Sequence, residues 1–120
     1  MFTISLLSLF KKMIVVCLML SPLWVHATGF NCANAKTFID KTICADARLS
    51  MLDADLNTVF REAQSEMSGV DGETGKRMDP VGAEQKQWIR KIRNKCQDKI
   101  CLVNVYEKRI ASIKQNWLDK

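Results

Sequence analysis

The stretch "NKCQDKICL", Asn94 to Leu102, places two cysteines five positions apart within a pattern that is otherwise helical. On an unbroken helix, a rise of about 1.5 Å per residue puts Cys96 and Cys101 too far apart for a disulfide, whose Cα atoms lie about 4.4 to 6.8 Å apart. If the two cysteines are bonded, the helix must break between them. Asp98 is then well placed to cap the following helix, with Gln97 in the turn. The stretch therefore predicts a tight connection between two helices, clamped by a disulfide.

The first 27 residues have the features of a signal peptide. Lys11 and Lys12 form a positive region, an apolar run follows, and Val25-His26-Ala27 offers the small-residue pattern that signal peptidase accepts. The run is too short to cross a bilayer, which needs roughly 20 apolar residues. Cys17 lacks the small residue that usually precedes a lipidated cysteine. We therefore expect cleavage of 1–27 and one domain over 28–120, periplasmic or secreted, with no transmembrane segment.

The chain that remains after cleavage has four cysteines and no histidine. An even number of cysteines in a small exported domain indicates disulfides, because the compartment is oxidising and a core of this size is marginal without them. A zinc site is the alternative, but no pair of short-spaced ligand motifs is present. We expect four disulfide-bonded cysteines and neither a metal nor a cofactor; the four are Cys32, Cys44, Cys96 and Cys101.

The pairing of the cysteines is a separate question from their oxidation. Cys32 precedes a predicted helix start at Thr37 and can fold back beside Cys44, which favours Cys32–Cys44 together with Cys96–Cys101. Four cysteines allow three pairings, so a cross-pairing that ties the N-terminal segment to the later helices stays open.

Two helices are expected in the first half of the domain. Thr37 and Asp40 have the form of a capping box for a short helix that runs to about Cys44. Ser50 and Asp53 repeat the signal for a longer helix. Apolar residues in that longer helix recur at steps of three and four and define one buried face: Leu52, Leu56, Val59, Phe60, Ala63 and Met67.

Two more helices follow a loop. The segment 68–82, "SGVDGETGKRMDPVG", has four glycines and one proline and is interpreted as a loop long enough to be functional. A third helix is expected to start near Pro80 with Val81, Gln85, Trp88, Ile89 and Ile92 inward. A last helix carries Leu102, Val105, Tyr106, Ile110, Ile113 and Trp117 at helical spacing. No alternating strand pattern appears, so we predict an all-α bundle of three to four helices.

Three polar residues lie beside these apolar stripes: Asp53, Gln85 and Arg109. One interpretation is a patch that binds a partner. The other is an interior network that sets how the helices align, which we favour because polar groups need partners to be buried at all. Trp88 and Tyr106 lie on inward stripes, so we expect them in the core rather than stacked on a ligand.

Catalysis is not expected. The chain after cleavage has no histidine, its cysteines are expected to be oxidised, and no pair of carboxylates is marked out for glycoside hydrolysis. The basic residues of the third helix and its turn, Arg90, Lys91 and Arg93 with Lys86, Lys95 and Lys99, fit an anionic glycan or lipid or simply a solvated helix face. We favour the solvated face, and export makes nucleic acid an unsuitable partner.

Three stretches resemble a known bacterial family: "NCANAKTFIDKTICADARLSMLDADLNTVF", "EQKQWIRKIRNKC" and "CLVNVYEKRI". They are similar to the N-terminal domain of the LprI lysozyme inhibitor, in residue order and approximate spacing over nearly the whole chain after cleavage. The resemblance implies a small all-helical domain with four disulfide-forming cysteines and, in the namesake, inhibition of lysozyme. Phe38 stands where the family often has proline, and Ile92 stands where it has arginine, with Arg93 next.

A lysozyme inhibitor must fill a cleft that holds two acidic residues and present a donor or cation to them. Lys76 and Arg77, in the glycine-rich loop, are the candidates, although such a loop also suits a plain connector. Loss of Lys11 and Lys12 leaves sixteen basic and thirteen acidic residues, a net charge of +3, which does not attract a cationic lysozyme. We expect a non-catalytic binding domain for lysozyme or another envelope or host protein. The alternative is an envelope interaction module that binds anionic glycan or lipid through the basic helix.

Overall fold

The computed structural model describes residues 29–119, so the predicted signal peptide lies outside the described residues. Four α-helices follow one another: α2 (Phe38–Ala45), α3 (Ala47–Met67), α4 (Pro80–Lys91) and α5 (Lys99–Ile113). Single turns of helix precede α2 and follow α4 and α5: η1 (Cys32–Asn34), η2 (Arg93–Lys95) and η3 (Lys114–Leu118). Two short strands, β1 (Gly69–Val70) and β2 (Arg77–Met78), complete the fold. The prediction of a small all-α bundle is confirmed.

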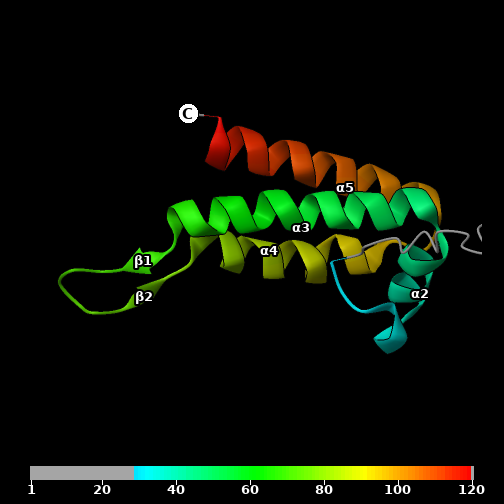
Figure 1. Ribbon diagram of the computed structural model, residues 1–120, viewed down its shortest axis with the longest axis horizontal. Coiled ribbons are helices and arrows are strands. Elements are labelled where there is room, and N and C mark those ends of the chain that lie inside the picture. Colours follow the sequence, from blue (N-terminus) through cyan, green and yellow to red (C-terminus); the bar gives the residue numbers. More distant parts are fainter. Residues whose placement is uncertain (1–28, 120) are drawn as a thin grey trace, which may run out of the picture.

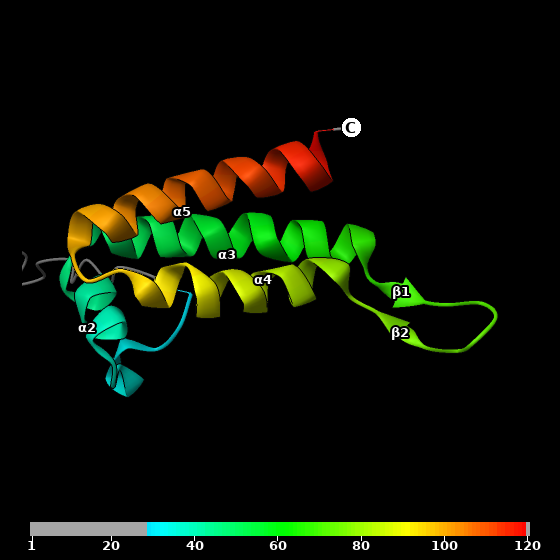
Figure 2. The ribbon, with the colours of Figure 1, turned by 180° about the vertical axis from the view of Figure 1, so that it is seen from behind.

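The helices α3, α4 and α5 lie side by side, with α3 packed against both of the others (Figure 1). The short helix α2 packs against α3 at one end of this bundle. The strands β1 and β2 extend from the opposite end, and the view from behind shows the same arrangement (Figure 2). The α2 end and the strand end of the molecule are therefore separated by the length of α3.

The helix caps explain where the first helices begin. The Thr37 side chain accepts a hydrogen bond from the Asp40 amide, as the capping box predicts. The predicted start of the long helix at Ser50 is wrong, because the Asp46 side chain caps it by accepting from the Leu49 amide. Ser50 is instead fully buried and donates its hydroxyl to the Ile43 carbonyl oxygen, which fastens α3 to α2.

The core fills the space between the three long helices. Trp88 and Tyr106 meet edge to face with ring centroids 5.3 Å apart, and both are buried, as predicted. The other large buried side chains come from every helix: Ile39, Ile43, Leu49, Leu56, Val59, Val81, Leu102 and Ile113. Each such side chain contributes about 1.5 to 3 kcal/mol when it leaves water, so this core is the main source of stability.

Two features differ from the predicted pattern. The segment predicted as a loop contains an antiparallel ribbon, in which Gly69 faces Met78 and Val70 faces Arg77. Two paired residues per strand are too few for an alternating pattern to show in the sequence. Ile92 was expected inward but is 47 % exposed, because α4 ends at Lys91 and the chain turns there.

Both favoured disulfides are present in the structure. Cys32 and Cys44 have Sγ atoms 2.09 Å apart, and Cys96 and Cys101 have Sγ atoms 2.00 Å apart. The chain is not helical between the end of η2 at Lys95 and the start of α5 at Lys99, so a break separates the two cysteines. The Asp98 side chain caps α5 by accepting a hydrogen bond from the Cys101 amide. Within residues 29–119, no helix is both long enough and apolar enough to span a bilayer.

Candidate functional site

The ribbon of β1 and β2 projects beyond the ends of the helices (Figure 1). Its strands are joined by a turn in which the Asp71 amide donates to the Lys76 carbonyl and the Gly75 amide donates to the Asp71 carbonyl, each over 2.9 Å. Val70 and Met78 are apolar yet 69 % and 49 % exposed. A projecting element with exposed apolar side chains is a candidate contact surface for another protein.

The turn of the ribbon is ordered by one carboxylate. Asp71 Oδ1 accepts from the Thr74 hydroxyl, the Thr74 amide and the Glu73 amide over 2.7, 2.7 and 3.1 Å. The bonds from Thr74 hold the pKa of Asp71 below its ordinary value. Gly75 takes a φ of +67°, a conformation that costs other residues energy. Local hydrogen bonds therefore order the turn in the free protein.

Lys76 and Arg77 are both exposed on this ribbon, Lys76 at the turn and Arg77 within β2. Among the described residues, neither has a carboxylate partner within ion-pair distance. The base of the ribbon is fixed by Asp79, which caps α4 through the Gly82 amide and accepts from Gln64 Nε2 over 2.8 Å. The ribbon that carries Lys76 and Arg77 is thus anchored to both α3 and α4.

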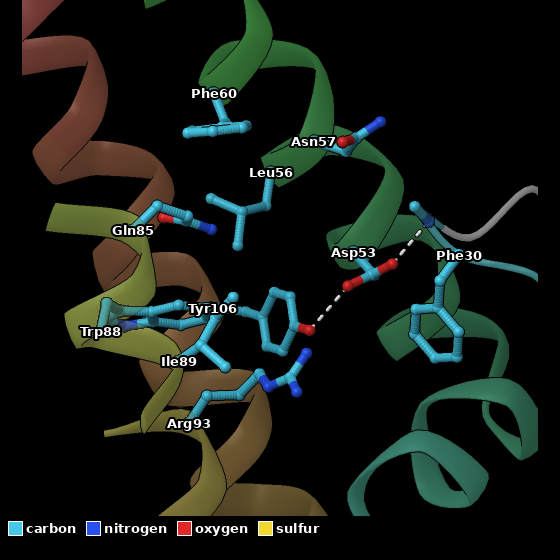
Figure 3. Close-up of a pocket in the computed structure, with 11 residues that line it drawn as sticks. Phe30, Asp53, Leu56, Asn57, Phe60, Gln85, Trp88, Ile89, Arg93 and Tyr106 are labelled. Carbon is cyan, nitrogen blue, oxygen red and sulfur yellow. Dashed lines mark hydrogen bonds between the residues drawn. The ribbon is translucent and has the colours of Figure 1, made fainter. Parts of the chain in front are cut away.

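A second group of polar side chains lies inside the bundle. Asp53 is 8 % exposed, and its Oδ1 accepts from the Tyr106 hydroxyl over 2.7 Å (Figure 3). Its Oδ2 accepts from the Gly29 amide over 2.5 Å. Burial, together with the charge of Asp53, raises the pKa of the Tyr106 hydroxyl well above its usual value. One carboxylate therefore ties α5 and the start of the described chain to α3.

Gln85 and Arg109 form another buried contact, between α4 and α5. Arg109 Nε donates to Gln85 Oε1 over 2.9 Å, and Arg109 Nη1 lies 3.4 Å from Glu84 Oε1. Glu84 also accepts from the Trp117 indole over 3.0 Å. Arg109 Nη2 is buried without a hydrogen-bond partner. Asp53, Gln85 and Arg109 all lie within the bundle, where they join pairs of helices.

A cavity of about 240 Å³ opens between α3 and α4 beside this interior network (Figure 3). We call it the α3–α4 cavity; its lining includes Leu56, Asn57, Phe60, Gln85, Ile89 and Arg93. No pattern in the sequence predicts this cavity. Its walls come from segments far apart in the chain, and Asn57 carries no signal in the sequence that marks it as a lining residue.

The basic residues of the third predicted helix do not share one surface. Arg90 and Lys91 are exposed at the end of α4, but the Arg93 side chain is only 15 % exposed. Arg93 turns toward the Tyr106 hydroxyl (Figure 3). Its Nη2 lies 3.9 Å from Asp40 Oδ1. The chain breaks helical geometry at Ile92, which separates Arg93 from its neighbours in sequence.

No group of three or more histidine, cysteine, aspartate or glutamate side chains within 29–119 is arranged to hold a metal ion.

Charges are unevenly spread along the molecule. Residues 61–84, around the ribbon, include six acidic and three basic residues, whereas 86–99, toward the disulfide clamp, include six basic residues and one acidic. Because α4 connects these two regions, the ribbon end is acidic and the other end is basic.

Comparison with protein families matches residues 32–113 to the family described as lysozyme inhibitor LprI. The matched range contains both disulfides, the ribbon and the helices α2 to α5. Comparison with curated proteins and with solved structures found no match.

Proposed function

Because the chain belongs to the LprI lysozyme inhibitor family, we propose that it is an exported binding domain that inhibits a lysozyme without catalysing a reaction. The family match over residues 32–113 is the observation that carries the proposal. Two disulfides support a periplasmic or secreted location, since such bonds persist in oxidising compartments.

The projecting ribbon is the element we assign to the lysozyme contact. A lysozyme cleft holds two carboxyl groups, and an inhibitor gains most by presenting cationic donors to them where water is excluded. Lys76 and Arg77 are exposed cations without a carboxylate partner in the described chain, carried on the part of the fold that extends furthest from the helices. In this arrangement, Val70 and Met78 pack against the apolar walls of the cleft.

The order of the ribbon favours tight binding. A segment that is disordered before binding loses conformational freedom on binding, and that loss lowers affinity. The bonds to Asp71 and the left-handed conformation of Gly75 shape the turn in the free protein. The lysozyme contact then requires little further ordering.

The uneven charge distribution allows a domain with a net charge of +3 to attract a cationic lysozyme at one end. The ribbon end carries more acidic than basic residues, so a cationic enzyme is attracted to that end and turned away from the other. The cations Lys76 and Arg77 then lie among residues that are mainly acidic.

The experiment is an assay of cell-wall lysis by several lysozymes with the protein that begins at Thr28. We expect inhibition at micromolar protein, and a loss of at least about tenfold in the double variant Lys76→Ala/Arg77→Ala, since two charge-assisted contacts are removed. The matched control is Lys86→Ala/Arg90→Ala, which makes the same change of charge on α4 and should alter inhibition by less than about twofold.

Absence of inhibition of every lysozyme tested contradicts the proposed function. If the ribbon variant inhibits as strongly as the wild type, the proposed function stands and the lysozyme contact lies outside the ribbon. Loss of inhibition in the α4 control alone points to the basic end as the contact.

A further inference from the structure

The α3–α4 cavity contains hydrogen-bonding groups that the fold does not use. Gln85 uses its Oε1 for Arg109, and its Nε2 has no partner among the described residues. The side chain of Asn57 likewise makes no hydrogen bond within the described chain, and it lines the same cavity. Gln85 is 8 % exposed and Asn57 is half-buried, and unused hydrogen-bonding groups on such side chains beside a cavity indicate a ligand that bonds to them.

The charges around the cavity favour a neutral ligand. Asp53 and Arg93 both line it, and Asp40 lies 3.9 Å from the Arg93 guanidinium. An anionic ligand meets the Asp53 carboxylate, and a cationic ligand meets Arg93, so either must be desolvated next to a like charge. A neutral polar ligand avoids both costs.

The rest of the lining is apolar. Leu56, Phe60 and Ile89 form walls beside the polar groups, so a ligand should have an apolar group next to its hydrogen-bonding atoms (Figure 3). The volume of about 240 Å³ lies below the range of pockets for drug-sized ligands, which start at about 300 Å³. A ligand about the size of a single sugar ring fits these limits.

We propose that the α3–α4 cavity binds one N-acetylated hexosamine ring. The acetamido carbonyl accepts a hydrogen bond from Gln85 Nε2, and the acetamido N–H donates to the Asn57 amide oxygen. The acetyl methyl group packs against Leu56 and Ile89, while the C–H face of the ring packs against Phe60. The site is separate from the ribbon and does not depend on inhibition of lysozyme.

The test is a titration of the protein that begins at Thr28 with N-acetylglucosamine, followed by NMR. The tryptophan indole N–H signals report directly, because Trp88 lines the cavity and Trp117 donates its indole N–H to Glu84. We expect a saturable shift of the Trp88 signal with a dissociation constant near 1 mM, the affinity usual for a ligand of so few atoms. The Trp117 signal should move much less.

Glucose is the matched ligand control, because it lacks the acetamido group and should bind at least about fivefold more weakly. Asn57→Ala should weaken binding of N-acetylglucosamine by a similar factor, and Asn104→Ala, on the exposed side of α5, should not. The proposal is overturned if N-acetylglucosamine gives no saturable shift, if glucose binds equally well, or if Asn57→Ala binds as tightly as Asn104→Ala.

Discussion

The Tyr106 hydroxyl donates to Asp53 over 2.7 Å, across 53 positions of sequence. The bond joins the middle of α5 to the first turns of α3 inside the bundle, and the second Asp53 oxygen accepts from the Gly29 amide. A Cβ atom at Gly29 would lie 2.9 Å from Asp53 Oδ2, so only glycine lets the chain approach this closely. Three segments that are distant in sequence therefore meet at one buried carboxylate.

The Tyr106 hydroxyl should ionise only well above about pH 10, the ordinary pKa of tyrosine. Its raised pKa means that the folded state keeps a proton that the unfolded state loses, so stability is fully present below pH 10 and falls as the pH rises further. The chain has one tyrosine, so the absorbance of the phenolate form reports on this group alone. Phenolate absorbance should rise together with unfolding after a jump to high pH.

The variant Tyr106→Phe leaves Asp53 without its hydroxyl donor and should cost about 1 to 3 kcal/mol of unfolding free energy at neutral pH. A phenolate signal at pH 10 in folded protein contradicts the buried bond to Asp53.

The contact between Gln85 and Arg109 predicts strong coupling of the two residues. Gln85→Leu leaves Arg109 Nε unpaired beside the already unpaired Nη2, and should cost about 2 kcal/mol. Adding Arg109→Met should recover much of that loss, because no buried donor is then left without a partner. Urea denaturation measures both. Gln87→Leu, exposed on the same helix, is the matched control and should change stability by less than about 0.5 kcal/mol.

The two disulfides should differ in their contribution to stability. They close segments of 12 and 5 residues, for which loss of freedom in the unfolded chain predicts about 3 and about 2 kcal/mol. The paired variants Cys32→Ala/Cys44→Ala and Cys96→Ala/Cys101→Ala test this order by denaturation. Mass mapping of the unreduced protein should recover the peptides joined as Cys32–Cys44 and Cys96–Cys101. Recovery of any cross-pair contradicts the structure.

Gly75 and Gly72 offer a matched comparison within the ribbon. A Cβ atom meets open space at both positions, but only Gly75 has a positive φ. Gly75→Val should therefore disorder the turn at a cost of about 1 to 2 kcal/mol, while Gly72→Val should not. Amide exchange at Thr74 measures the order of the turn. If the ribbon holds lysozyme, inhibition should fall in Gly75→Val and stay near wild type in Gly72→Val.

The turn should also respond to acid. The bonds from Thr74 lower the pKa of Asp71 in the folded state, so they stabilise the turn at pH values above the ordinary pKa of aspartate. This stability is lost as the pH falls through the lowered pKa of the folded state. The Thr74 amide signal should move toward a disordered position at low pH. Asp71→Asn should show little of this acid response, since its side chain does not titrate.

Local patterns in the sequence were enough to predict much of the fold. The spacing of Cys96 and Cys101 requires a break in a helix, and Asp98 is a good cap, so the turn between α4 and α5 follows from a few adjacent residues. Apolar stripes of helical period likewise predict that Trp88 and Tyr106 face the core. Such signals are readable because the interacting groups lie within one or two turns of each other.

Tertiary structure decided the features that depend on contacts between distant segments. Asp46, rather than Ser50, caps α3, and packing of α2 on α3 gives Ser50 a buried carbonyl partner at Ile43. The same applies to Arg93, which the break at Ile92 turns toward Tyr106 and away from Arg90. The α3–α4 cavity is the clearest case, because its lining comes from four parts of the chain. The sequence by itself determined which faces are apolar and where helices end; packing determined which polar groups those faces enclose.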